Sequence, residues 1–109
     1  VGTYLKALAA QASDVPFFVA LPESTIDWTC PGGEHIPIEE RDESEVLTIA
    51  GADAGGQILQ INLASSHSRA LNPAFDVTPA ELVQALITEH GNFEASELGL
   101  QRLRSVAGI

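Results

Sequence analysis

The chain has 109 residues, the size of one domain, and its 15 Asp and Glu against 5 Lys and Arg give a formal net charge of −10. So acidic a chain repels a phosphate backbone, and we therefore predict no nucleic-acid partner. A single cysteine offers no intramolecular disulfide, and no apolar run is long enough to span a bilayer, so the sequence predicts a cytoplasmic protein with no membrane partner.

The first part of the chain predicts a helix followed by a buried strand. Within Thr3–Gln11 and just beyond it, apolar residues recur at the spacing of one helical face. These residues are Leu5, Leu8, Ala9 and Ala12. The almost uniformly apolar segment Val15–Leu21 is typical of a parallel strand covered on both faces. A helix followed by such a strand indicates an α/β fold, and because the helical pattern starts at once we expect a piece of a larger protein.

The middle of the chain predicts a long loop and two short strands. The passage Pro22–Asp42 is rich in proline and glycine, and loops of this length are more often functional than structureless. A short strand is expected over Val46–Ile49. Leu59–Leu63 alternates apolar and polar residues, which predicts a half-buried strand.

A capping motif predicts a helix near the carboxyl end. Thr78 is a good N-cap residue, Pro79 suits the first helical position, and Glu81 completes a capping box. The helix is therefore expected from Pro79 to His90, with Gly91 as the residue that ends it.

The last residues, 92–109, form a less distinctive extension. Within it, Glu94–Val106 places Leu100, Leu103 and Val106 on one side, which predicts a second helix. Residues 1–109 are thus expected to form one partial domain that ends in a helical extension.

Two small groups of residues are candidates for substrate binding. Ser24, Thr25 and Asp27 follow the carboxyl end of the predicted buried strand, where open α/β sheets place ligands, and they could orient a sugar. Alternatively, they only cap a turn and hold the loop. The backbone amides of Gly2 and Thr3 open a helix and could hold a phosphate, although a free helix start is common.

Acidic and histidine residues do not form a recognisable metal motif. The acidic residues of the middle of the chain are not spaced as in a Ca²⁺ loop, so we interpret them as a solvated face. They are Asp27, Glu34, Glu39, Glu40, Asp42, Glu43 and Glu45. His35, His67, His90 and Cys30 are scattered and give no zinc pattern. We predict no metal.

No nucleophile is clearly activated. Cys30 is either incidental or a reactive thiol, the latter only if a cationic neighbour lowers its pKa. Ser65–Ser68 contains His67, but adjacent residues rarely point at one another, so a polar loop is preferred over a catalytic pair.

Five segments together resemble the carboxyl-terminal part of S-methyl-5-thioribose-1-phosphate isomerases. They are Gly2–Ala10, Val15–Pro22, Ser24–Trp28, Ile36–Arg41 and Asn72–Pro79. The wider family includes ribose-1,5-bisphosphate isomerase and the regulatory subunits of translation initiation factor 2B. The string Ile-Pro-Ile-Glu-Glu-Arg at Ile36–Arg41 resembles the isomerase specifically, and the resemblance covers the chain from Gly2 to about Gly91.

The resemblance implies a Rossmann-like domain and an aldose–ketose isomerase of methionine salvage. It also implies a homodimer, a sugar-phosphate substrate and no cofactor, with the remainder of the same enzyme as partner. The family's catalytic cysteine and aspartate precede the segment that Gly2 begins, so it implies no catalytic residue in this chain. Cys30 does not align with the catalytic cysteine.

This leaves two alternatives and one expectation about activity. The chain could instead belong to a non-catalytic regulatory module like the initiation factor 2B subunits, or to a ribose-1,5-bisphosphate isomerase. Opening the sugar ring and moving hydrogen between C1 and C2 needs a positioned acid and base. We therefore expect the chain alone to be inactive.

Overall fold

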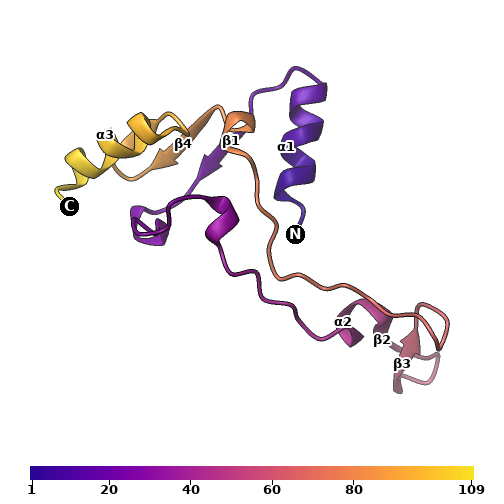
Figure 1. Ribbon diagram of the computed structural model, residues 1–109. Coiled ribbons are helices and arrows are strands. Elements are labelled where there is room, and N and C mark those ends of the chain that lie inside the picture. The colour runs from indigo at the N-terminus through magenta and orange to yellow at the C-terminus, as the bar shows by residue number, and fades with distance from the viewer. The chain divides into compact units, whose positions relative to one another are not determined.

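The computed structural model describes all residues, Val1 to Ile109, and they form two compact units (Figure 1). The first unit contains Val1–Ile36 and Asp76–Ile109, and the second contains Pro37–Phe75. None of the helices combines the length and apolar character needed to cross a membrane.

The first unit is built on a three-stranded sheet with the order β1-β4-β5. Helix α1 (Thr3–Ala12) leads into β1 (Phe18–Ala20), which runs parallel to β4 (Ala85–Thr88). Strand β5 (Gly91–Phe93) returns antiparallel to β4. The predicted α/β class with a parallel pair and flanking helices is confirmed, although β1 is shorter than the predicted strand.

The helix predicted from Pro79 to His90 is wrong. Only one 3₁₀ turn, Ala80–Leu82, forms there, without a side-chain cap, and β4 follows. The N–H of Gln84 donates to the carbonyl of Phe17 at 2.7 Å, so pairing with β1 supplies the backbone hydrogen bonds that a helix would otherwise form. Gly91 has φ 118° and is the first residue of β5, paired with Thr88, rather than the end of a helix.

Helix α3 (Glu97–Ala107) confirms the second predicted helix, starting slightly later than expected. Ser96 is its N-cap, because its hydroxyl accepts the N–H of Gly99 at 3.1 Å. The helix ends at Gly108, whose φ of 78° is the left-handed conformation that glycine favours. Its side chain Leu103 is fully buried.

The second unit consists of a short helix and a hairpin. Helix α2 (Ser44–Leu47) precedes β2 (Thr48–Ala52), which pairs antiparallel with β3 (Ile58–Asn62). The strand predicted over Val46–Ile49 is therefore wrong in its first half. The carboxylate of Asp42 accepts the N–H of Ser44, and the hydroxyl of Thr48 donates to the carbonyl of Ser44, so local bonds stabilise a helical turn there. Strand β3 is confirmed, but its residues are exposed rather than half-buried.

Few apolar side chains of the chain are fully buried. Ala7 and Leu103 are the buried hydrophobic residues. The predicted inner face of α1 is open, since Leu5 is 71% and Leu8 is 40% exposed. The helix is as predicted, but its fully buried residue is Ala7, which is not on the predicted face.

Candidate functional site

Ser24 and Thr25 lie in a 3₁₀ turn, Glu23–Thr25, that follows β1. The hydroxyl of Thr25 donates to the carbonyl of Pro22 at 2.9 Å, a bond of the kind that stabilises a turn. Ser24 is exposed, and its hydroxyl makes no hydrogen bond within the chain. Sugar binding by these two residues stays a prediction, with Ser24 the freer hydroxyl.

Asp27 lies in the same loop as an exposed carboxylate. Its Oδ1 accepts the hydroxyl of Thr29 at 2.7 Å and the N–H of Thr29 at 2.9 Å. The hydroxyl bond is the main reason why the pKa of Asp27 lies below its usual value. Asp27 is thus a fixed negative group with Oδ2 available for a ligand, and its role in substrate binding also stays a prediction.

A pair of carboxylates, Glu23 and Glu89, lies near the carboxyl ends of the parallel strands. Glu23 follows β1 and Glu89 follows β4, and the N–H of Glu23 donates to Oε2 of Glu89 at 2.9 Å. This bond is the main reason why the pKa of Glu89 is lowered. Glu89 is not among the residues predicted for the site, because the sequence pattern placed it inside a helix and not after a strand.

Glu23 also fixes the far end of its own loop. Its Oε1 accepts the indole N–H of Trp28 at 3.1 Å. The guanidinium of Arg104, on α3, lies 5.8 Å from the centre of the Trp28 ring, which is within cation–π range. The loop after β1 therefore contacts both the β4–β5 turn and α3.

Glu23, Glu89 and His90 bring three potential metal-ligand atoms within 4.8 Å of one another. No metal is predicted from the sequence. Exposed acidic groups often gather without an ion, and both carboxylates already accept N–H donors from the protein. We assign no metal to this cluster.

The amides at the start of α1 already have a partner. Oδ2 of Asp76 accepts the N–H of Gly2 at 2.8 Å and the N–H of Tyr4 at 3.1 Å. The Gly2 bond is the main cause of the lowered pKa of Asp76. A phosphate bound by the predicted pair Gly2 and Thr3 would have to share the Gly2 amide with Asp76, and phosphate binding there stays a prediction.

A mainly apolar depression of about 780 Å³ adjoins Trp28 and α3. Its walls include Val83, Leu86, Leu100 and Arg104. Cys30 lies in the same depression, where its Sγ donates to the carbonyl of Gly32 at 3.3 Å.

In the second unit, two segments of the family resemblance pair with each other. Glu40 and Pro73 form an antiparallel bridge, and the N–H of Arg41 donates to the carbonyl of Asn72 at 2.8 Å. The N–H of Ala74 donates to the carbonyl of Glu39 at 2.8 Å. The Ile36–Arg41 string and the Asn72 segment thus lie side by side.

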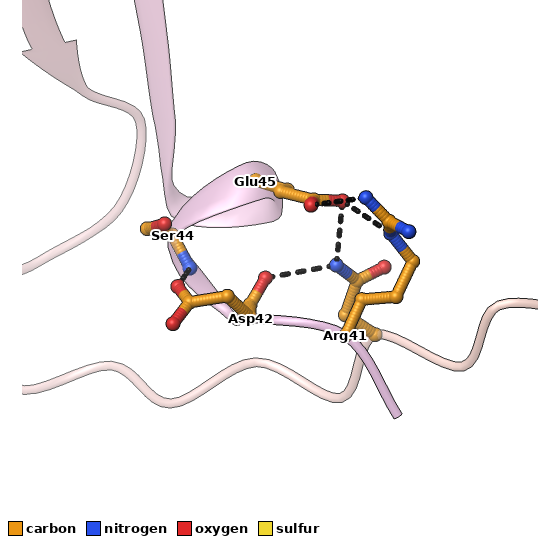
Figure 2. Close-up of polar contacts among 5 residues, drawn as sticks. Arg41, Asp42, Ser44 and Glu45 are labelled. Carbon is orange, nitrogen blue, oxygen red and sulfur yellow. Dashed lines mark hydrogen bonds and ion pairs between the residues drawn. The ribbon is translucent and has the colours of Figure 1, made fainter. Parts of the chain in front are cut away.

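Arg41 and Asn72 both donate to the carboxylate of Glu45, Asn72 through Nδ2 at 3.3 Å, and this shared acceptor adds to the pairing. Nη2 and Nε of Arg41 lie 2.7 and 2.9 Å from the two carboxylate oxygens of Glu45 (Figure 2). Asn72 Nδ2 donates to the carbonyl of Asp42 at 2.9 Å, and Asp42 Oδ1 accepts the N–H of Ser44 at 2.8 Å. The arrangement consists of exposed, internally satisfied groups, so we interpret it as structural.

Comparison with known proteins places the chain in a family. The model of the initiation factor 2 subunit family matches residues 1–95. The chain belongs to the initiation factor 2 subunit family. Among curated members, methylthioribose-1-phosphate isomerase of Gluconobacter oxydans is 58% identical over 94% of this chain and 28% of its own length. The isomerase of Acidiphilium cryptum is 56% identical over 92% of this chain and 28% of its own length.

Solved structures of the initiation factor 2 subunit family share the fold. The 5-methylthioribose 1-phosphate isomerase of Pyrococcus horikoshii matches with a TM-score of 0.80 and 36% identity, over 97% of this chain and 27% of that chain. The delta subunit of translation initiation factor eIF-2B from A. fulgidus matches with a TM-score of 0.76 and 33% identity, over 100% of this chain and 28% of that chain. The chain thus spans a little over a quarter of the length of the relatives it matches.

Proposed function

We propose that the chain is a segment of a methylthioribose-1-phosphate isomerase. The complete protein would convert S-methyl-5-thioribose 1-phosphate to S-methyl-5-thioribulose 1-phosphate in methionine salvage. The observation that carries this proposal is the 58% identity to a curated isomerase across 94% of the chain. Identity to the eIF-2B delta subunit is lower, at 33%.

In this reaction the segment would bind the substrate and would not supply the catalytic acid and base. The substrate is a glycosyl phosphate, so its ring must open before hydrogen moves between C1 and C2, and both steps need a positioned acid and base. The resemblance puts those groups outside this segment. The loop after β1, with Ser24, Thr25 and Asp27, would contact the sugar, and Gly2 and Thr3 would lie near the phosphate.

The remaining properties are proposed with the activity. The complete enzyme would act as a homodimer in the cytoplasm, without a cofactor and without a nucleic-acid or membrane partner. The net charge of −10 supports the absence of a nucleic-acid partner.

A regulatory module like the initiation factor subunits is the second candidate. The TM-score of 0.76 to the eIF-2B delta subunit favours it, because the fold alone serves both functions. A ribose-1,5-bisphosphate isomerase is a third reading, against which the Ile36–Arg41 string argues.

One experiment separates these functions. The complete protein encoded by the gene and the chain alone are each incubated with S-methyl-5-thioribose 1-phosphate, and the ketose product is measured. We expect turnover by the complete protein and none by the chain alone. Equal rates would show that the segment holds the catalytic groups, and a complete protein inactive on this substrate would contradict the proposed activity.

A further inference from the structure

One long-range hydrogen bond joins the loop Pro22–Cys30 to a distant part of the chain. The N–H of Glu23 donates to Oε2 of Glu89 at 2.9 Å, across 66 positions of sequence. The other hydrogen bonds of this loop join residues that are two to five positions apart, such as Trp28 to Glu23 and Thr29 to Asp27. Glu89 therefore supplies the loop's long-range hydrogen bond.

The topology puts this bond at the edge of the sheet where ligands bind. Strands β1 and β4 are parallel, with Phe18 opposite Ala85 and Ala20 opposite Ile87, so their carboxyl ends meet at one edge. The loop follows β1 directly, and Glu89 follows β4 directly. Open α/β sheets bind ligands outside the carboxyl ends of their strands.

The far end of the loop is fixed by a separate set of contacts. The indole of Trp28 donates to Oε1 of Glu23 at 3.1 Å, and Arg104 lies 5.8 Å from its ring centre. The side chain of Glu23 thus connects the two ends of the loop, while the backbone N–H of Glu23 is bound by Glu89. Ser24, Thr25 and Asp27 lie between these two anchors.

We propose that Glu89 is a positioning residue for substrate: through the amide of Glu23 it holds the Pro22–Cys30 loop in the conformation that binds the sugar phosphate. This inference rests on the proposed function. Glu89 itself does not touch the reacting atoms. Its loss removes the hydrogen bond that holds the Glu23 amide, so the loop samples conformations in which its hydroxyls and carboxylate no longer converge on the substrate, and the substrate binds less tightly.

The test uses the complete protein with Glu89→Ala and Glu89→Gln. The amide oxygen of Gln can still accept the N–H of Glu23, so Glu89→Gln is expected to keep KM within about twofold of wild type. Glu89→Ala is expected to raise KM about tenfold while kcat changes less than about twofold, the pattern of lost binding rather than lost chemistry. Glu81→Ala is the matched control, because Glu81 is exposed and its side chain makes no hydrogen bond in the structure.

Amide hydrogen exchange measures the tether without relying on activity. In the complete protein, Glu89→Ala is expected to speed exchange in the peptide that contains the Glu23 amide, and Glu89→Gln and Glu81→Ala are not. An unchanged KM in Glu89→Ala, equal effects in the Ala and Gln variants, or unchanged exchange would each overturn the proposal. If the wild-type protein does not convert the substrate, the proposed function itself fails, and this result is distinct from an active wild type with an unaffected Glu89→Ala variant.

Discussion

The carboxylate of Asp76 binds the amide of Gly2 at 2.8 Å across 74 positions of sequence. The same oxygen accepts the N–H of Tyr4, so one side chain satisfies two of the free N–H groups at the start of α1. The first turn of α1 has no acidic residue of its own. Asp76 thus supplies from a distant segment the negative charge that a helix start favours.

Stability is therefore expected to depend on the ionisation of Asp76. Its pKa in the folded chain is lowered from the usual 3.8, chiefly by the Gly2 amide. A lowered pKa means that the contribution is complete above the unfolded value and is lost as pH falls through the folded value. Asp76→Asn is therefore expected to lessen the fall in stability as the pH drops below about 4, the region of the unfolded pKa.

The measurement is urea unfolding at a series of pH values. Other carboxylates with a lowered pKa, such as Asp42 and Glu43, also make stability fall at low pH, and they do so equally in the wild type and in Asp76→Asn. Glu81→Gln serves as the control, because its side chain makes no hydrogen bond in the structure. A pH profile in Asp76→Asn identical to wild type would show that the Gly2 bond does not contribute.

Leu103 is expected to be the most sensitive position of α3. It is fully buried, so Leu103→Ala removes packed methyl groups and is expected to cost about 2 to 5 kcal/mol of unfolding free energy. Leu98, on the same helix, is 53% exposed, so Leu98→Ala makes the same chemical change at a site with less packing. Urea denaturation of both variants, followed by circular dichroism, checks this, and equal losses would contradict the packing assigned to α3.

Asp27 tests the predicted substrate loop directly. Asp27→Asn keeps an oxygen that can accept the N–H of Thr29 but removes the charge that strengthens a hydrogen bond to a sugar hydroxyl. We expect kcat/KM of the complete protein to fall about tenfold with an unchanged melting temperature. Steady-state kinetics with Glu81→Gln as control measures this, and wild-type kinetics in Asp27→Asn would remove Asp27 from the substrate site.

Removal of metal ions is expected to leave the isomerase rate unchanged. The resemblance implies no cofactor, and the carboxylates of Glu23 and Glu89 already accept N–H donors. The check is turnover by the complete protein before and after dialysis against a chelator. A loss of activity that a divalent cation restores would point instead to the cluster of Glu23, Glu89 and His90.

Local patterns predicted the elements whose stabilising contacts are local. The helical spacing in Thr3–Gln11 corresponds to α1, and the alternation in Leu59–Leu63 corresponds to β3. The strings at Ile36–Arg41 and Asn72–Pro79 identified the family, because such strings are properties of the sequence itself.

The candidate site was predicted only in part. The apolar run that begins at Val15 predicted a strand with a ligand-binding loop after it. The structure has Ser24, Thr25 and Asp27 in one loop after β1. The contacts of Glu89 with Glu23 and of Asp76 with Gly2 join residues 66 and 74 positions apart, and no spacing rule connects them.

The sequence by itself determined the α/β class, helix α1 and the family. Only the tertiary structure decided the state of residues 79–90, where a well-formed capping motif precedes a strand. Capping favours a helix by local hydrogen bonds, but parallel pairing of Ala85–Thr88 with Phe18–Ala20 satisfies the same backbone groups and packs both strands together. That pairing also places Glu89 beside the loop after β1, and so it builds the candidate site.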